Sequence, residues 1–404
     1  MLPMTVESKI RKLIGNKGRI TFADFMAVAL YDPEDGYYRS SHRVSESGDF
    51  FTSPAAHPAF AAALCIQARC FWISMGCPRP FRVVEMGAGS GLLADDFVAY
   101  ANRLDTEYAS ALKYSAIDRA ASGQPAAISG DTGQGDPTAS IRSVDCVISN
   151  ELFDSFPAHR FVMKDGELQE LFVVEKDGQL VSEPAKPSTQ LIADRLAPLI
   201  GVLEDGYVGE LCLEFSAWGN DIGRIMERGY VLSVDYGYPM SELYAPERNQ
   251  GTLRCYYQHT LNANPFQHIG QQDISVHVDF TAVKEALDEC GFEAVSFSTQ
   301  GDFLDEMGLN VFNENLGRAG LPPRELEANR VGMREIARPD GLGAFKVAIH
   351  AKGLDPGCES QSPPPDAHLP LPLLDDDPRR VRLFEAAYPQ AADFTATWDE
   401  LLGG

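Results

Sequence analysis

VVEMGAGSG, residues 83–91, settles the architecture of this chain. A short apolar run over 81–86 predicts a buried strand, and the residues after the glycines predict a helix over 91–103. Gly87, Gly89 and Gly91 stand between them, where the backbone must turn sharply and let a ligand approach. A strand, a glycine turn and a helix in this order indicate the first unit of an α/β sheet.

The chain beyond this turn alternates between strand and helix patterns. Further strands are predicted at 113–118, 144–149, 229–236, 292–298 and 343–351, with a helix over 280–290. Such alternation gives a largely parallel sheet with helices on both faces. The predicted fold class is therefore α/β with a Rossmann-like sheet.

Four segments depart from this alternation. Residues 1–80 are predicted to form a helical N-terminal cap before a core domain over 81–353, and within the cap Thr21 begins the second of two short helices. Insertions in the core are expected at about 158–183, as strands joined by turns, and at 237–279, where no helix period is clear. Residues 354–404 form a proline-rich acidic tail in which we expect one short helix.

Composition excludes several classes of function. The 34 Lys and Arg residues against 58 Asp and Glu leave a net charge of -24, which disfavours binding to a nucleic-acid backbone. The eight cysteines form no CxxC pair and the eight histidines no HExxH motif, so no metal site is predicted. No apolar run approaches the roughly 20 residues of a membrane span. We expect a bacterial cytoplasmic protein, or a protein of the mitochondrial matrix if the source is eukaryotic.

The glycine spacing narrows the ligand. The spacing is G-x-G-x-G, and Leu92 takes the place of the third glycine of a dehydrogenase fingerprint. Glu85 lies in the strand, and Asp118 ends the second strand, where an acid grips a ribose diol. These features together fit S-adenosylmethionine (SAM). A tight turn without a ligand, and an ordinary turn aspartate at 118, are the alternatives.

Longer strings sharpen this prediction. Seven motifs occur in order: LYDPEDGYY (30–38), GDFFTSP (48–54), EMGAGSGLLADD (85–96), SNELFDSFP (149–157), VDYGYP (234–239), GTLRCYYQH (251–259) and DISVHVDF (273–280). Together they closely resemble the MidA-like family of class I SAM-dependent methyltransferases, over about residues 5–353. In that family the mitochondrial members are protein arginine methyltransferases that assist assembly of respiratory complex I. The chain departs from the family pattern directly after Asp118.

The resemblance directs attention to acids at the carboxyl edge of the sheet. If the acceptor is a guanidinium, carboxylates are the natural partners because planar paired hydrogen bonds orient it. Glu151 is the first candidate and Asp154 the second, while Asn150 is expected to hold either SAM or the acceptor. A helix-cap role for Asn150 and Asp154 is the alternative. Asp235 is expected either to face the acceptor or to be satisfied by loop amides.

Other candidates lie around this edge. Tyr236 is expected to form a wall of the site, and Asp49 is expected to fold over SAM from the cap. His277 and Asp279 lie in the second insertion, where a lid over the substrate is expected. A packing or hydrogen-bonding role is the alternative for His277.

Three functions follow from these residues. The first is a methyltransferase acting on an arginine of a protein, either a respiratory-complex subunit or another arginine-containing protein. The second is a small-molecule methyltransferase with the same SAM site, since a fold does not choose an acceptor. The third is an assembly factor that binds SAM without catalysis.

Overall fold

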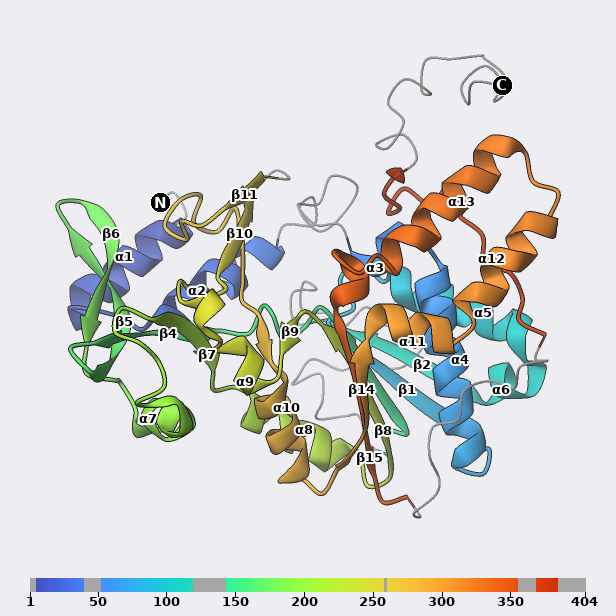
Figure 1. Cartoon of the computed structure of the whole chain (residues 1–404), viewed down its shortest axis with the longest axis horizontal. Coiled ribbons are helices and arrows are strands. Elements are labelled where there is room, and N and C mark those ends of the chain that lie inside the picture. The colour runs from blue at the N-terminus through green and yellow to red at the C-terminus, as the bar shows by residue number, and fades with distance from the viewer. Residues whose placement is uncertain (1–4, 40–51, 119–142, 258–259, 355–367, 384–404) are drawn as a thin grey trace.

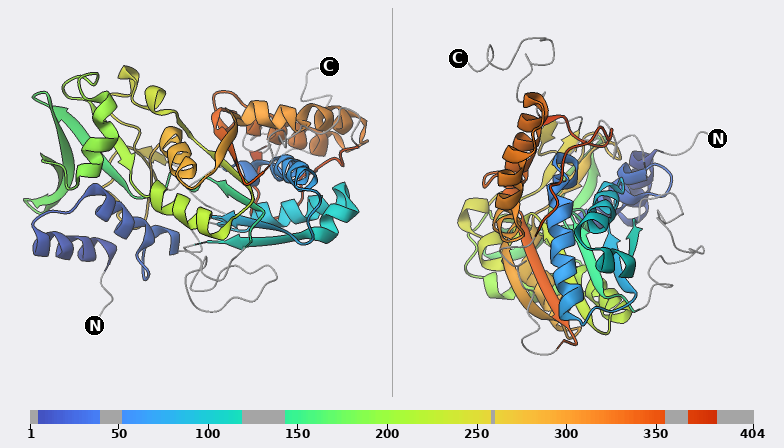
Figure 2. Two further views of the ribbon diagram at one scale, coloured as in Figure 1. Left: turned by 90° about the horizontal axis from the view of Figure 1, so that it is seen from below. Right: turned by 90° about the vertical axis from the view of Figure 1, so that its right-hand side faces the viewer.

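The computed structural model describes residues 5–39, 52–118, 143–257, 260–354 and 368–383. Asp49 lies outside these ranges, as do residues 119–141 after Asp118 and most of the predicted tail helix. The described parts form two bodies that lie side by side (Figure 1; Figure 2, left). None of the helices in the described ranges is long and apolar enough to cross a bilayer.

A six-stranded sheet forms the centre of one body. Its order is β14-β15-β8-β3-β1-β2, in which β2, β1, β3 and β8 are parallel and β15 runs antiparallel to both of its neighbours, β8 and β14. The strands are β1 Phe81–Met86, β2 Leu112–Ile117, β3 Cys146–Asn150, β8 Gly229–Asp235, β14 Glu293–Thr299 and β15 Lys346–Lys352. This confirms the predicted α/β class with a largely parallel sheet.

Helices bury both faces of this sheet, which explains why its strands are continuous apolar runs. In β1, Val83 packs in the cluster that holds α4 and α5, and Val84 packs on the opposite face with α8 and α10. The helices of this body are α4 Ala59–Ser74, α5 Leu92–Leu104, α6 Thr106–Ala111, α8 Phe215–Ile225, α10 Phe280–Asp288, α11 Gln300–Glu306, α12 Leu309–Arg318 and α13 Pro323–Ile336, with the short turn η4 Leu342–Ala344. The last three α-helices fall in a stretch for which no element was predicted.

The second body is an antiparallel sheet with the N-terminal helices packed on it. Its strand order is β6-β5-β4-β7. Ile20, between the two helices, exchanges backbone hydrogen bonds of 3.1 and 2.9 Å with Val173 of the sheet. The elements are α1 Val6–Lys17, α2 Phe22–Tyr31, β4 Ala158–Lys164, β5 Glu167–Lys176, β6 Gln179–Ala185, α7 Gln190–Leu196, η2 Ala197–Leu199 and β7 Val208–Cys212.

The two hairpin turns of this sheet are those expected from the sequence. Asp165 and Gly166 have φ of +53° and +75°, and Asp177 and Gly178 have φ of +51° and +77°. Two successive residues with positive φ make a type I′ turn, for which Asp-Gly is a favoured pair.

The insertion at 237–279 is organised by strand pairing. Three strands, β11-β10-β12, form a small sheet whose apolar residues share a cluster with α1 and α2, and β13 pairs parallel with β9. The elements are β9 Gly237–Tyr238, α9 Met240–Leu243, η3 Pro246–Arg248, β10 Arg254–Tyr257, β11 Thr260–Asn262, β12 Asp273–Ser275 and β13 Val278–Asp279. The absence of a helix period in the sequence is explained by these short strands.

Two predicted boundaries require correction. The helical cap over 1–80 is split, because α1 and α2 pack in the second body whereas α4 packs on the six-stranded sheet. Two short elements connect them, η1 Tyr37–Arg39 and α3 Ser53–Ala56. The tail is not wholly a linker either, because Leu369 is 4% exposed and packs in the core of the first body.

Candidate active site

Four loops meet at the carboxyl edge of the parallel strands. Residues 87–91, the glycine loop, follow β1, and residues 151–157, the acidic loop, follow β3. Asp118 follows β2 and Tyr236 follows β8. Because β8, β3, β1 and β2 are neighbours in this order, their ends form one continuous edge. Ligands of open α/β sheets bind at such an edge.

The glycine loop has left-handed backbone at all three glycines. The φ angles are +78° at Gly87, +51° at Gly89 and +77° at Gly91. Gly91 is the N-cap residue of α5, and a Cβ there would meet no atom within 4 Å. Glycine is therefore required at this position by the backbone conformation, and the space in front of the loop stays open.

Asp118 joins the glycine loop directly. Its Oδ2 accepts a hydrogen bond of 2.8 Å from the backbone amide of Gly89. The residues predicted to hold SAM are thus brought together, apart from Asp49, and the open, amide-lined turn fits this ligand. When bound, SAM supplies a methyl group on a sulfonium that is open to in-line displacement.

Glu85 has a partner within the protein. The side chain is buried, and its Oε2 accepts a hydrogen bond of 2.9 Å from Tyr114 on the neighbouring strand β2. Burial raises the pKa of Glu85 to about 8. The cost of burying this acid is thus reduced by the tyrosine and by protonation.

The acidic loop begins with strained backbone at Glu151. This residue has φ of +49°, which is uncommon outside glycine and is held here by a 2.9 Å bond from its amide to the Val234 carbonyl. Asn150 donates a 3.0 Å hydrogen bond to Glu151 Oε1. The backbone N–H of Ser53 in α3 lies close to the same carboxylate and lowers its pKa. Glu151 therefore has an N–H group of Asn150 and one of Ser53 beside it.

Asp235 holds the backbone of the acidic loop through hydrogen bonds. Its Oδ2 accepts hydrogen bonds from the amides of Leu152, Phe153 and Asp154, at 3.1, 2.9 and 3.4 Å, and its Oδ1 from the amide of Tyr236 at 2.9 Å. The carboxylate is fully buried. Of the two roles left open for Asp235, this geometry corresponds to satisfaction by loop amides.

Asp154 projects from this loop with one oxygen unused. Its Oδ2 accepts a 2.6 Å hydrogen bond from Tyr236, whereas Oδ1 is buried and has no partner among the described residues. Asn150 Oδ1 is likewise buried and unpartnered there. No helix begins anywhere in residues 150–157, so the helix-cap alternative for Asn150 and Asp154 is wrong.

A fourth acid, Asp273, completes the group. It begins β12, is fully buried and accepts a 2.6 Å hydrogen bond from Tyr38 of η1. Both residues belong to family motifs, LYDPEDGYY and DISVHVDF, but no site role was predicted for either. The acid lies in a small strand of the second insertion, and only the pairing of β12 with β10 brings it to the site. We refer to Glu151, Asp154, Asp235 and Asp273 as the acidic cluster.

Burial and mutual repulsion raise the pKa values throughout the acidic cluster. Loss of hydration, and then the charge of Asp154, raise the pKa of Glu151 and that of Asp273 to about 8. Burial also raises the pKa values of Asp154 and Asp235, and the hydrogen bond from Tyr236 opposes this at Asp154. In the described part of the chain, no group of three or more His, Cys, Asp or Glu side chains is arranged to hold a metal ion.

His277 and Asp279 have different surroundings. The His277 ring packs edge-on against Tyr236, with centroids 5.3 Å apart, and burial lowers the pKa of His277 to about 4. Its Nδ1 has no partner among the described residues. Asp279 instead caps α10 through the amides of Thr281 and Ala282, and it pairs with Arg195 at 2.6 Å. The predicted substrate role of Asp279 is replaced by this structural one.

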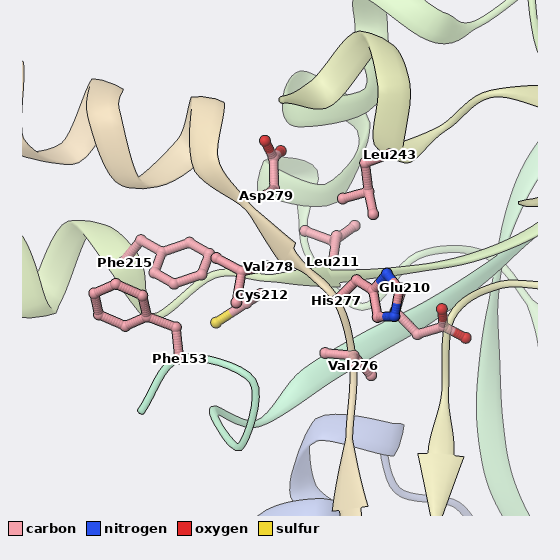
Figure 3. A pocket seen from close by; sticks show the side chains of 10 residues that line it. All are labelled: Phe153, Glu210, Leu211, Cys212, Phe215, Leu243, Val276, His277, Val278 and Asp279. Atoms are coloured by element: carbon pink, nitrogen blue, oxygen red, sulfur yellow. The ribbon is translucent and has the colours of Figure 1, made fainter. Parts of the chain in front are cut away.

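Both residues line a small pocket of about 10 Å³ behind the acidic loop. A pocket of this size has room for about one water molecule. Figure 3 shows Phe153 and Phe215 on one side of it, His277 with Glu210 on another, and Asp279 apart from both. The pocket is too small for a substrate.

The parallel sheet, its left-handed glycine loop and the acid after the second strand define a class I SAM-dependent methyltransferase. Residues 63–298 match the model of the family Methyltransf_28, described as "Putative S-adenosyl-L-methionine-dependent methyltransferase". The chain belongs to this family, which confirms the resemblance and the cofactor predicted from the motifs.

Solved and curated relatives agree with this assignment. A crystal structure from Burkholderia thailandensis, described as a "likely methyl transferase" bound to S-adenosyl-homocysteine, is 26% identical with a TM-score of 0.73, covering 87% of this chain and 92% of that one. The Drosophila melanogaster "Protein arginine methyltransferase NDUFAF7 homolog, mitochondrial" is 27% identical, covering 87% of this chain and 85% of its own. The Homo sapiens "Protein arginine methyltransferase NDUFAF7, mitochondrial" is 25% identical, covering 74% and 72%.

Proposed function

We propose that this chain transfers a methyl group from SAM to the guanidinium of an arginine residue in a protein. The observation that carries the proposal is Asp154 Oδ1, a buried carboxylate oxygen without a partner among the described residues, within the acidic cluster. A buried acid is costly unless it meets a cation or a hydrogen-bond donor. The names of the curated relatives support the same acceptor.

The guanidinium is the cation that fits this arrangement best. It is planar, always charged and carries five N–H groups, so several carboxylates at different angles pair with it at once. Asp154 and Asp273 would accept these N–H groups, because Tyr236 and Tyr38 each bind one carboxylate oxygen and leave the other free to face the ligand. The two tyrosines thereby fix the directions of the acids.

Glu151 would take the proton that the guanidinium loses on methylation. Methyl transfer is an in-line displacement, so the protein has to align the two reactants and remove one proton. A glutamate whose pKa is raised to about 8 holds a proton more strongly than an exposed one, and it is a correspondingly better base. The hydrogen bond from Asn150 keeps it in place, and the Ser53 amide lies close to it.

Radiolabelled methyl-SAM incubated with host lysate tests the proposal. We expect a labelled protein band with the wild type and with Glu289→Gln, an exposed glutamate at the end of α10. Glu151→Gln should lower the label by about 100-fold or more while SAM affinity stays within about twofold. Hydrolysis of the labelled protein should yield methylarginine.

The remaining outcomes assign the other functions. Label found only in small molecules would mean a small-molecule methyltransferase. No label, with SAM still bound in calorimetry, would mean an assembly factor without catalysis. Undiminished labelling by Glu151→Gln would remove Glu151 from the mechanism.

A further inference from the structure

Part of the C-terminal tail is built into the fold. We refer to residues 368–383, the red segment that passes α12 and α13 in Figure 1, as the strap. The Leu371 carbonyl accepts a 2.7 Å hydrogen bond from Arg103 of α5, and the Leu374 amide donates one of 2.9 Å to Asn329 of α13. The strap lies outside the part of the chain that the family model matches.

Arg380 is the anchor of the strap. Its side chain is 4% exposed and forms a two-pronged ion pair with Asp96 of α5, at 2.7 and 2.6 Å. A bond of 3.0 Å to Asp375 adds a contact within the strap. Such planar paired bonds fix direction as well as distance. Arg380 is thus locked against the helix that follows the glycine loop.

The same guanidinium also holds α3. Arg380 donates a 3.0 Å hydrogen bond to the Pro54 carbonyl, and the next residue, Val381, donates its amide to the Ala55 carbonyl at 3.0 Å. These carbonyls belong to the short helix whose first amide, that of Ser53, lies close to the Glu151 carboxylate and lowers its pKa. The strap therefore reaches the acidic cluster through a single four-residue helix.

Arg379 makes a separate connection to the glycine loop. It donates a 3.1 Å hydrogen bond to the Ser90 carbonyl and pairs with Asp95 at 2.7 Å. Adjacent arginines thus contact the two halves of the site, one at the loop expected to hold SAM and the other at the helix whose first amide lies close to Glu151.

We propose that Arg380 is a positioning residue for methyl transfer, acting through α3 to hold Glu151 at the acceptor side of the site. The inference rests on the proposed role of Glu151 as the proton acceptor. Loosening α3 would move the Ser53 amide away from Glu151, and this amide lowers the pKa of Glu151. The other groups that face Glu151 are Asn150, Asp154, Asp235 and Asp273, and the substitution leaves them unchanged.

The test measures the titration of Glu151 itself. In protein labelled with ¹³C at the glutamate carboxyl carbons, the Glu151 signal is the one absent from Glu151→Gln. In Arg380→Met we expect the pKa of Glu151 to rise by about one unit, and kcat to fall by about tenfold or more. Arg380→Lys, which keeps a donor to the Pro54 carbonyl, should recover part of both.

Two variants serve as contrasts. Arg103→Met removes a different contact to the strap, and it should leave both the titration and kcat as in the wild type. Arg379→Met should raise the KM for SAM without moving the titration of Glu151. An unchanged titration in folded Arg380→Met would overturn the proposal.

Two results would call for a second variant or measurement: an Arg380→Met protein that does not fold, and a wild type without activity. If Arg380→Met does not fold because Asp96 is left buried without its partner, Asp96→Asn/Arg380→Met removes both charges and is expected to show the same shift. If the wild type proves inactive, the proposed function fails, but the carboxyl titration still reports whether the strap positions Glu151.

Discussion

Leu152 of the acidic loop lies directly against Gly87 of the glycine loop. A Cβ on Gly87 would stand 2.9 Å from Leu152 Cδ1, closer than side-chain carbons pack, and the residue has φ of +78°. The loop expected to bind SAM and the loop that carries the acids are therefore in contact. A substitution that moves one of these loops therefore also displaces the other.

Gly87→Ala should weaken SAM binding by about tenfold or more. The methyl group would collide with Leu152, and a left-handed non-glycine residue costs about 1–2 kcal/mol. Adding Leu152→Ala removes the collision but not the backbone cost, so the double variant should recover only part of the affinity. Titration calorimetry with SAM measures both.

Gly15→Ala is the matched control for this pair. Gly15 lies within α1, and a Cβ there meets nothing within 4 Å. This substitution should leave the affinity unchanged. Equal SAM affinity in Gly87→Ala and the wild type would mean that the glycine loop and the acidic loop can move apart without loss of SAM binding.

Tyr236→Phe should move the pH profile of methylation. The tyrosine hydroxyl donates to Asp154 and lowers the pKa of that acid, so its removal raises the pKa. The acid limb of kcat/KM for an arginine peptide should then shift to higher pH, because Asp154 must be ionised to bind the guanidinium. Tyr38→Phe should act in the same way through Asp273. Tyr207→Phe is a control, because its hydroxyl donates to the Ala245 carbonyl at 3.4 Å and not to an acid of the cluster; its profile should match that of the wild type.

Asp235→Asn should destabilise the fold more than it alters chemistry. The carboxylate accepts four backbone amides, and an asparagine would turn its own NH₂ toward at least one of them. Leaving a buried amide unpaired costs about 1–3 kcal/mol per group. Urea unfolding should show a fall of that size in the free energy of unfolding. SAM affinity should fall only as far as the acidic loop becomes less ordered. A variant as stable as the wild type would point instead to a direct role at the acceptor.

The strands of the six-stranded sheet and the position of the glycine loop followed from local patterns. Strands buried on both faces read as apolar runs, and the residues 81–86 mark β1 without error. The Asp-Gly turns likewise announce their hairpins, since few other residues adopt two successive positive φ angles. These features depend on neighbours in sequence.

The features that were not predicted depend on residues that are neighbours in space. Asp273 and Tyr38 are 235 positions apart, and no local pattern joins them. The role of Asp235 was left open because an acid after a strand faces either a ligand or the amides of the next loop. The strap was predicted only as part of a proline-rich acidic tail, because its few buried contacts, among them those of Leu369 and Arg380, leave no local pattern in the sequence.

The ligand-free protein should lose stability as the pH rises from about 4 to above 8. The folded-state pKa values of Glu151 and Asp273 are about 8, whereas unfolded glutamate and aspartate titrate near about 4. Because the folded-state values are raised, the stabilising contribution is complete below the unfolded pKa and disappears as the pH passes through the folded one. Thermal unfolding from pH 5 to 9 should show Tm falling, with a shallower slope in Glu151→Gln and in Asp273→Asn.

Glu289→Gln should keep the wild-type slope, and an arginine peptide should flatten the wild-type curve by pairing with the ionised acids. Parallel slopes in all four proteins would show that these two acids do not titrate in the range that their burial implies.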